Sequence, residues 1–287
     1  MAKTRTMAQK RVMGDIATYI IIGLFIIATV IPIWLVIQQA FYKLDSTLSI
    51  SFWPKDATLK NFKLIFTQPE FPMAFKNSLI LSATSTLIVI IIGTGAAYAF
   101  SRFSFPGRNA MLTGFLVYMM LPTTAAMIAQ KFIIDKVQVF FGEVSIVYPC
   151  LILMYIAGTM TFTIWNLKGY FDTIPKSLEE AAIIDGASRI KVFTKIMLPL
   201  AAPAIAVSAL FAFMASWTDF ATGWIFISDQ TQYTLAMQLN LWISDPNNPL
   251  WSQFAAGSIV VALPVAILYF AFQRYIVGGL TAGGVKG

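Results

Sequence analysis

Residues 77–100 of this chain read NSLILSATSTLIVIIIGTGAAYAF, a run that contains no Asp, Glu, Lys, Arg or His. A helix rises 1.5 Å per residue, so about 20 such residues cross the roughly 30 Å of hydrocarbon in a bilayer. Lipid offers no hydrogen-bond partner to an unpaired backbone amide, and a segment of this kind therefore has to be helical. The stretch predicts a transmembrane helix.

Further charge-free apolar segments occur on both sides of this run. Together with it they predict six spans, at residues 17–37, 77–100, 111–130, 144–165, 200–217 and 253–273. The 200–217 segment is the shortest, and Pro203 lies at its start. The first segment follows four Lys and Arg but is not followed by a small-x-small cleavage site, so we expect an uncleaved span rather than a signal peptide.

The composition agrees with a membrane protein. Of the 287 residues 58% are hydrophobic and 11% are charged, and the mean hydropathy is +0.74. A soluble domain usually carries about 25% charged residues. Cys150 is the single cysteine and there is no histidine, which excludes an intrachain disulfide, the usual zinc sites and any triad that uses an imidazole. We expect no catalytic, metal or cofactor site in this chain and no nucleic-acid partner.

The distribution of charge predicts the orientation. The N-terminus, the 101–110 loop, the 166–199 loop and the residues after 273 hold 13 of the 20 Lys and Arg. The alternate loops are nearly balanced in charge, and the loop at 218–252 has no Lys or Arg. The positive-inside rule therefore predicts that both termini lie in the cytoplasm. We expect a cytoplasmic N-terminus at 1–16, a six-span domain at 17–273 and a cytoplasmic tail at 274–287.

The sequence shows no residues by which this chain alone would couple transport to a proton gradient, a membrane potential or ATP hydrolysis. The six predicted spans lack ionisable residues, which proton relays and voltage sensors place in the membrane. No Gly is followed by Lys, so the phosphate-binding loop G-x-x-x-x-G-K-[ST] is absent. A sodium site built from backbone carbonyls and hydroxyls is compatible with this sequence.

The longest predicted cytoplasmic loop, at 166–203, has the pattern of two short helices. Ser177 is placed to cap the first, with Glu180 completing a capping box. Gly186 is placed to end this helix in the left-handed conformation, and Ser188 to begin the second. Apolar stripes follow each helix: Leu178, Ala181 and Ala182 in the first, and Ile190, Phe193 and Met197 in the second. The pattern fits a helix held by a partner protein or an amphipathic helix in the headgroup layer.

A resemblance to a known family favours the partner. The loop resembles the EAA loop of ABC-importer permeases, E-A-A-x-x-D-G-A-x-x-x-x-x-F-x-x-I-x-L-P-x-x-x-P. The matching residues are Glu180, Ala181, Ala182, Asp185, Gly186, Ala187, Phe193, Ile196, Leu198, Pro199 and Pro203. The whole chain is similar to the carbohydrate-uptake branch, and specifically to the smaller permease subunit of maltose-type importers. Residues 216–220, SWTDF, resemble the family's SWNEF with two replacements.

The resemblance implies an all-α, six-helix type I ABC-importer subunit in the bacterial inner membrane. It implies a second permease, two ATPase subunits that bind ATP-Mg, and an extracytoplasmic sugar-binding protein as partners, together with membrane lipid. Glu180 and its neighbours would form the helix that docks into a cleft of one ATPase. In maltose-type importers the sugar contacts come mainly from the other permease.

Two further segments are matched by the same resemblance. In the external loop, Asp245, Pro246, Asn247, Asn248 and Pro249 would reach the binding protein and its sugar; the alternative is an ordinary surface turn. In the tail, Gly283, Gly284 and Lys286 would contact the ATPase; the alternative is a frayed terminus.

Other functions stay open at this point. An ABC importer for a polyol, another oligosaccharide such as an alginate-like one, or glycerol phosphate would share these features. A secondary transporter or channel acting alone would transport without an ATPase subunit. A membrane anchor or receptor without transport would have no use for a complete EAA loop.

Overall fold

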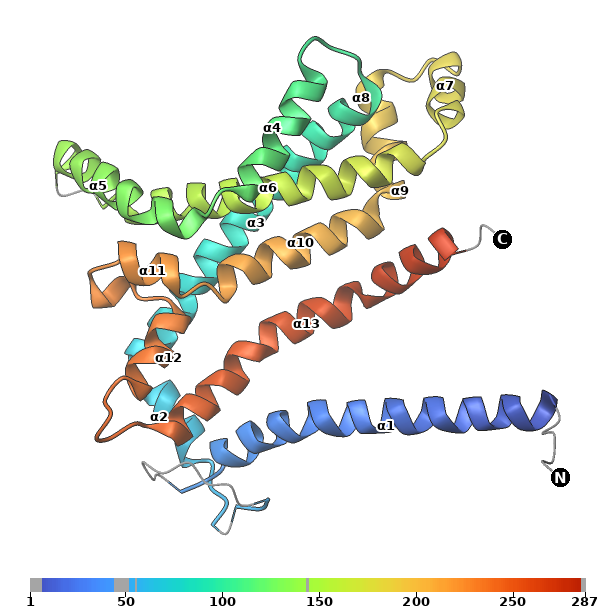
Figure 1. The fold of residues 1–287 in the computed structure, drawn as a ribbon. Helices are drawn as coiled ribbons and strands as arrows, with labels where there is room; N and C mark the ends of the chain where they lie inside the picture. The colour runs from blue at the N-terminus through green and yellow to red at the C-terminus, as the bar shows by residue number, and fades with distance from the viewer. Residues whose placement is uncertain (1–6, 44–51, 55, 143–144, 285–287) are drawn as a thin grey trace. The chain divides into compact units, whose positions relative to one another are not determined.

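The computed structural model describes residues 7–43, 52–54, 56–142 and 145–284, and every regular element in these ranges is a helix (Figure 1). The long helices are α1 (Met7–Ala40), α3 (Glu70–Arg102), α5 (Thr123–Phe141), α6 (Val147–Thr173), α10 (Ala202–Trp217) and α13 (Trp251–Gly284). The shorter ones are α2 (Lys60–Thr67), α4 (Arg108–Met120), α7 (Ser177–Ile184), α8 (Arg189–Val192), η1 (Phe193–Met197), α9 (Leu198–Leu200), α11 (Ala221–Phe226), η2 (Gln230–Gln232) and α12 (Leu235–Ile243).

Four helices are long and apolar enough to cross a membrane: α1, α3, α6 and α13. They contain the predicted segments 17–37, 77–100 and 253–273, and α6 contains 144–165 except for its first three residues. The number rises to six if each of two bent helix pairs counts as one span. Four of the predicted segments are therefore confirmed as long single helices, and the count of six spans stays a prediction.

The predicted span at 111–130 is divided between two helices. Helix α4 ends at Met120, and α5 begins at Thr123 with a sharp change of direction. Pro122 cannot donate a backbone hydrogen bond, and it forces the preceding Leu121 into an extended conformation, with φ −75° and ψ 134°. The proline thus divides the apolar run.

The predicted segment 200–217 also starts at a bend. Helix α10 begins at Ala202 and is inclined by 74° to the helical stretch Arg189–Leu200. Ala201 joins the two with φ −83° and ψ 0°, and Pro203 occupies the first turn of α10, where a missing N–H costs nothing.

The chain divides into two compact units, of which residues 69–238 and 261–287 form the larger. In this unit α3 packs against both α6 and α10. Small side chains allow the close approach: a Cβ built on Gly93 would lie 2.8 Å from Cγ2 of Thr163, and Ser85 hydrogen-bonds Ser216 at 3.4 Å. Close packing of small residues is a usual means of joining helices in a membrane.

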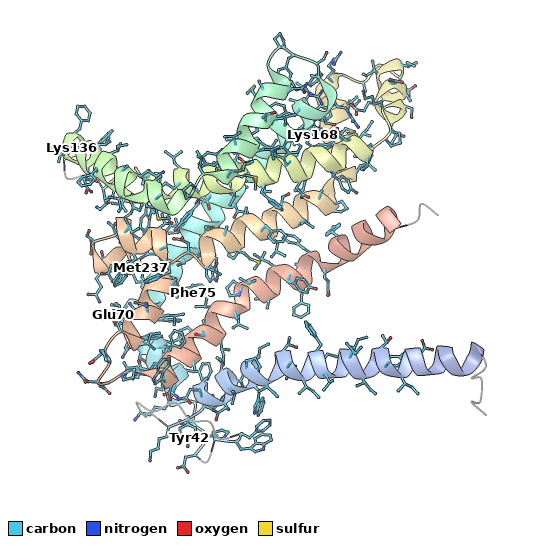
Figure 2. All side chains as sticks on the ribbon, in the orientation of Figure 1. Tyr42, Glu70, Phe75, Lys136, Lys168 and Met237 are labelled. Atoms are coloured by element: carbon cyan, nitrogen blue, oxygen red, sulfur yellow. The ribbon has the colours of Figure 1, made fainter. Side chains whose placement is uncertain are left out.

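The smaller unit contains residues 1–68 and 239–260. Asn61 of α2 donates to the carbonyls of Ala40 and Tyr42, at 2.8 and 2.7 Å, and so holds the end of α1. Tyr42 is labelled in Figure 2. Trp34 of α1 donates to the Phe52 carbonyl at 2.9 Å. Phe52 and Trp53, which follow α1 in the chain, therefore contact its Trp34.

Candidate functional site

The predicted coupling segment, residues 174–203, follows α6 and begins with a proline turn. Ile174 is extended, as the residue before a proline usually is, and the N–H groups of Glu179 and Glu180 both donate to the Lys176 carbonyl at 3.0 Å. Lys176 is therefore the N-cap, and Ser177 is already inside the helix with no capping hydrogen bond. The predicted capping box of Ser177 and Glu180 was wrong, because Pro175 starts the helix earlier.

The end of α7 confirms the predicted role of Gly186. Its φ is +84°, in the left-handed region that favours glycine. The Gly186 N–H donates to the Ile183 carbonyl at 3.0 Å, and the Ala187 N–H donates to the Ala182 carbonyl at 2.9 Å. This pair of bonds is the Schellman motif, and it satisfies carbonyls that the helix end would leave unpaired.

The second helix starts at the predicted residue. Ser188 is extended, and its hydroxyl accepts from the Lys191 N–H at 3.3 Å, which is an N-cap. The helix then widens at η1, where the Leu198 N–H donates to the Phe193 carbonyl five residues earlier. Pro199 follows directly in α9. The motif residues Phe193, Ile196 and Leu198 therefore lie in the two helical turns that precede the bend at Ala201.

A buried carboxylate that the sequence interpretation missed joins α7 to α3. Glu179 is 9% exposed; its Oε2 accepts from the Tyr98 hydroxyl at 2.8 Å, and its Oε1 accepts from Nε of Arg102. Arg102 also donates from Nη2 to the Ile174 carbonyl at 2.8 Å. Each charge is thus paired and hydrogen-bonded, which a buried ion pair requires. We call Tyr98, Arg102 and Glu179 the α3–α7 anchor.

The anchor extends to α6 through polar side chains. Arg102 donates from Nη1 to the Ser101 hydroxyl at 3.1 Å, and Ser101 donates to Oδ1 of Asp172 at 2.6 Å. Lys168, which is labelled in Figure 2, forms an ion pair with the other oxygen of Asp172. The ends of α3, α6 and α7 are therefore joined by one hydrogen-bonded network.

Apolar packing supports the same junction. The ring of Tyr98 lies 4.8 Å from that of Phe193 and 5.6 Å from that of Phe171, measured between centroids. Val192 and Met197 are buried in the same cluster, and Ala182 and Ala187 pack against it. The family-motif residues Ala182, Ala187 and Phe193 therefore hold the coupling segment to the helices.

The remaining motif residues of α7 face outward. Glu180, Ala181, Asp185 and Gly186 are exposed, and Pro199 is exposed farther along the segment. Large apolar side chains lie exposed among them, with Ile184 85% and Ile190 76% exposed. Exposed apolar side chains beside charged ones are typical of a protein-binding or membrane-contacting surface. The predicted stripe of Leu178 and Ala181 is part of this outer surface rather than of the packed face.

The predicted external loop has an ordered tip in the smaller unit. The Asn247 N–H donates to Oδ1 of Asp245 at 2.9 Å, an Asx turn, and the Leu250 N–H donates to the Trp242 carbonyl at 2.7 Å. Asp245, Pro246, Asn247 and Asn248 are exposed and Pro249 is partly so. Their side chains are accessible, and whether they contact a binding protein stays a prediction.

The predicted tail contact is described only in part. Helix α13 includes Gly283 and Gly284, and Lys286 lies outside the described residues. Within the described part of the chain, no group of three or more Cys, Asp or Glu side chains is placed to hold a metal ion.

Comparison with known proteins identifies relatives over nearly the full length. Residues 89–281 match the family model described as "Binding-protein-dependent transport system inner membrane component". The chain is 35% identical over 277 residues to the maltodextrin transport system permease protein MdxG of Bacillus subtilis, covering 96% of this chain and 98% of the relative. It is 32% identical over 284 residues to the maltose/maltodextrin transport system permease protein MalG of Escherichia coli K12, covering 94% and 95%.

The fold also has solved counterparts. A chain in the crystal structure of a bacterial ABC transporter involved in the import of the acidic polysaccharide alginate superposes with a TM-score of 0.77, at 20% identity, covering 95% of this chain and all of that one. A chain of the MetNI methionine ABC transporter gives a TM-score of 0.54 at 15% identity over 76% of this chain. At these identities the likeness concerns the fold alone.

Proposed function

Because the chain belongs to the family of binding-protein-dependent transport system inner membrane components, we propose that it forms one half of the membrane pathway of an ATP-driven importer for a maltodextrin-like oligosaccharide. The observation that carries the substrate class is the 35% identity, over nearly the full length of both chains, with a permease named for maltodextrin transport. The partners would be a second permease, two ATPase subunits that hold ATP-Mg, and an extracytoplasmic binding protein.

The coupling segment would transmit the ATPase motion. Its exposed surface, with Glu180, Ile184 and Ile190, would dock into an ATPase cleft, while the α3–α7 anchor holds its inner surface to the membrane helices. To shift the pathway from 1:99 to 99:1 between its inward-open and outward-open states, the ATPases must bind the two states with free energies that differ by about 5.5 kcal/mol. A helix that is capped at Gly186 and joined to α3 by a buried ion pair can pass on a displacement of this kind without bending.

The orientation predicted by the positive-inside rule supports this arrangement. It places both termini and the coupling segment in the cytoplasm, and residues 245–249 outside. The external loop would then contact the sugar-loaded binding protein. The tail, with Gly283, Gly284 and Lys286, would reach the ATPase on the cytoplasmic side.

The substrate class is tested with the purified complex and its own binding protein. The sugar that raises the melting temperature of the binding protein is identified first, and its uptake into proteoliposomes is then measured with and without internal ATP. We expect a linear glucose oligosaccharide to give ATP-dependent uptake. If only a polyol or glycerol phosphate raised the melting temperature of the binding protein, the proposed oligosaccharide substrate would be contradicted. Uptake without the ATPase subunits would contradict an ATP-driven importer.

A further inference from the structure

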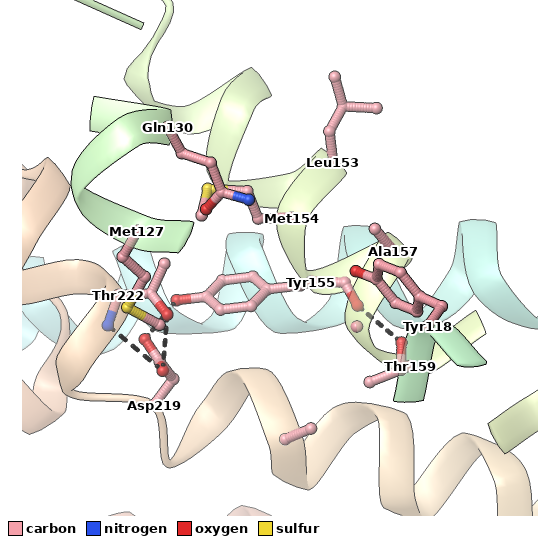
Figure 3. Close-up of a pocket in the computed structure, with 12 residues that line it drawn as sticks. Tyr118, Met127, Gln130, Leu153, Met154, Tyr155, Ala157, Thr159, Asp219 and Thr222 are labelled. Atoms are coloured by element: carbon pink, nitrogen blue, oxygen red, sulfur yellow. Dashed lines mark hydrogen bonds between the residues drawn. The ribbon is translucent and has the colours of Figure 1, made fainter. Parts of the chain in front are cut away.

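A cleft in the larger unit combines polar and apolar side chains from the predicted spans 111–130, 144–165 and 200–217 and from the start of the predicted external loop. Its volume is about 410 Å³, in the roughly 300–1,000 Å³ range of small-molecule sites. Helix α6 forms one wall, α4 and α5 line it on both sides of the break at Pro122, and the junction of α10 and α11 forms its floor (Figure 3). The break between α4 and α5 therefore adjoins the cleft.

The floor is a buried polar arrangement. Tyr155 is 8% exposed, and its hydroxyl donates to Oδ2 of Asp219 at 3.0 Å. Oδ2 also accepts from the Gly223 N–H at 3.2 Å, and Oδ1 accepts from the Thr222 hydroxyl at 2.9 Å. These donors fix the carboxylate at the edge of the cleft (Figure 3). Asp219 belongs to the SWTDF stretch, in the place where the resembling family pattern has Glu.

Two further lining residues, Gln130 and Tyr118, offer accessible polar groups to a ligand. Among the described residues, neither the Gln130 amide nor the Tyr118 hydroxyl makes a hydrogen bond, and both side chains line the cleft (Figure 3). An amide offers donors and an acceptor, and a phenol offers one of each beside an apolar ring. The thioethers of Met127 and Met154 add adaptable apolar surface.

This combination suits one ligand chemistry. A glycosyl unit has hydroxyls that both donate and accept, and apolar C–H faces that pack against aromatic rings. The described lining contains no Lys or Arg, and the Asp219 carboxylate would repel a second carboxylate. The cleft therefore favours a neutral sugar over a uronate.

We propose that this cleft is a subsite for a neutral glycosyl unit, in which Gln130 and Tyr118 hydrogen-bond sugar hydroxyls and Asp219 excludes acidic sugars. The inference rests on the proposed importer function and extends it, because it assigns direct sugar contact to this subunit as well as to its partner. Tyr155 lies eight residues after the start of α6, about 12 Å along the helix. In the predicted orientation the cleft would receive sugar after its release from the binding protein.

The test measures binding to the complete complex, trapped with ATP and vanadate in the absence of binding protein. Labelled maltotriose and labelled trigalacturonate are the probes, and the variants are Gln130→Ala, Asp219→Asn and, as an exposed control on the same helix, Lys136→Ala. Losing the hydrogen bonds of Gln130 should weaken maltotriose binding about tenfold. Asp219→Asn should raise the ratio of trigalacturonate to maltotriose binding, and Lys136→Ala should bind as the unmodified complex does.

The outcomes separate the two proposals. If the unmodified complex imports maltotriose with its binding protein but Gln130→Ala binds it with unchanged affinity, the subsite is contradicted and the importer function stands. If Asp219→Asn left the ratio of trigalacturonate to maltotriose binding unchanged, the proposed role of Asp219 in excluding acidic sugars would be contradicted. A complex that imports no oligosaccharide at all would contradict the proposed function itself.

Discussion

Arg102, the last residue of α3, donates from Nε to the carboxylate of Glu179 in α7, and the two side chains are only 6% and 12% exposed. The pair joins residues 77 positions apart in the sequence. It connects a membrane helix directly to the segment whose outer surface we assign to the ATPase.

Removing either charge of this pair should destabilise the junction. Replacing Arg102 by Ala leaves Glu179 buried without its counter-ion, and the loss of one partner from a buried pair costs about 3–5 kcal/mol. We expect Arg102→Ala to lower the melting temperature of the purified complex and to reduce sugar uptake per ATP hydrolysed. The double variant Arg102→Met, Glu179→Leu should recover much of the stability without recovering the coupling.

The neighbouring Glu180 provides the matched control for this experiment. Glu180 is exposed on the surface assigned to the ATPase, so Glu180→Ala should leave the melting temperature nearly unchanged when both variants are compared in permease purified without the ATPase subunits. If Arg102→Ala and Glu180→Ala behaved alike in the thermal melt, the assignment of Glu179 as the structural carboxylate would be incorrect.

Gly186 should tolerate few side chains, for a reason that concerns the backbone alone. A Cβ at this position meets no atom within 4 Å, but the φ of +84° costs an L-residue about 1–2 kcal/mol. Gly186→Val should therefore displace the end of α7 and reduce ATPase coupling, while membrane insertion stays normal. Gly186→Asn should be milder, since Asn visits the left-handed region more readily. Unchanged transport in Gly186→Val would contradict the role of this cap.

Gly93 is constrained by packing instead. Its Cβ would lie 2.8 Å from Cγ2 of Thr163, so Gly93→Ala should destabilise the α3–α6 contact by about 1–3 kcal/mol. Adding Thr163→Ser removes that methyl group, keeps the hydroxyl and should restore the melting temperature. Gly95→Ala is the control on the same helix, because a Cβ there meets nothing within 4 Å. A double variant as unstable as Gly93→Ala would show that the close approach is not the cause.

The orientation can be tested with a membrane-impermeant thiol reagent in a Cys150→Ala background. A cysteine placed at Asn247 should react in intact cells, and one placed at Ser188 should react only after the membrane is opened. Both positions are exposed, so access to the side chain does not limit the reaction. The reverse labelling would place the coupling segment outside and remove the basis of the ATPase assignment.

The sequence predicted the local features of the coupling segment better than its packing. Gly186 and Ser188 act within one turn of their own positions, and both assignments were confirmed. The burial of Glu179 depends on Arg102, far away in the sequence, and local pattern does not show which of two adjacent carboxylates faces that partner. The one available signal was that Glu179, and not Glu180, lies three residues before a member of the predicted apolar stripe, Ala182, and so shares its helix face.

For the membrane helices too, the sequence predicted some features and missed others. Charge-free length was sufficient to predict α1, α3, α6 and α13. It was insufficient at 111–130, where the local effect of Pro122 on Leu121 outweighs the apolar composition. Residues such as Tyr155 and Asp219 come from separate helices, so their contact could not be read from either segment alone.

We propose that this chain connects an external binding protein to ATPases on the other side of the membrane, and the decisive measurement is the ATPase activity of the reconstituted complex. Activity is measured with and without sugar-loaded binding protein, for the unmodified complex, for a variant with residues 245–249 shortened, and for Glu180→Ala. We predict that the shortened variant assembles and hydrolyses ATP at the basal rate but responds weakly to the loaded binding protein. Glu180→Ala should instead weaken ATPase attachment and leave docking of the binding protein intact. A full response from the shortened variant, together with normal ATPase attachment in Glu180→Ala, would show that neither segment has the proposed role.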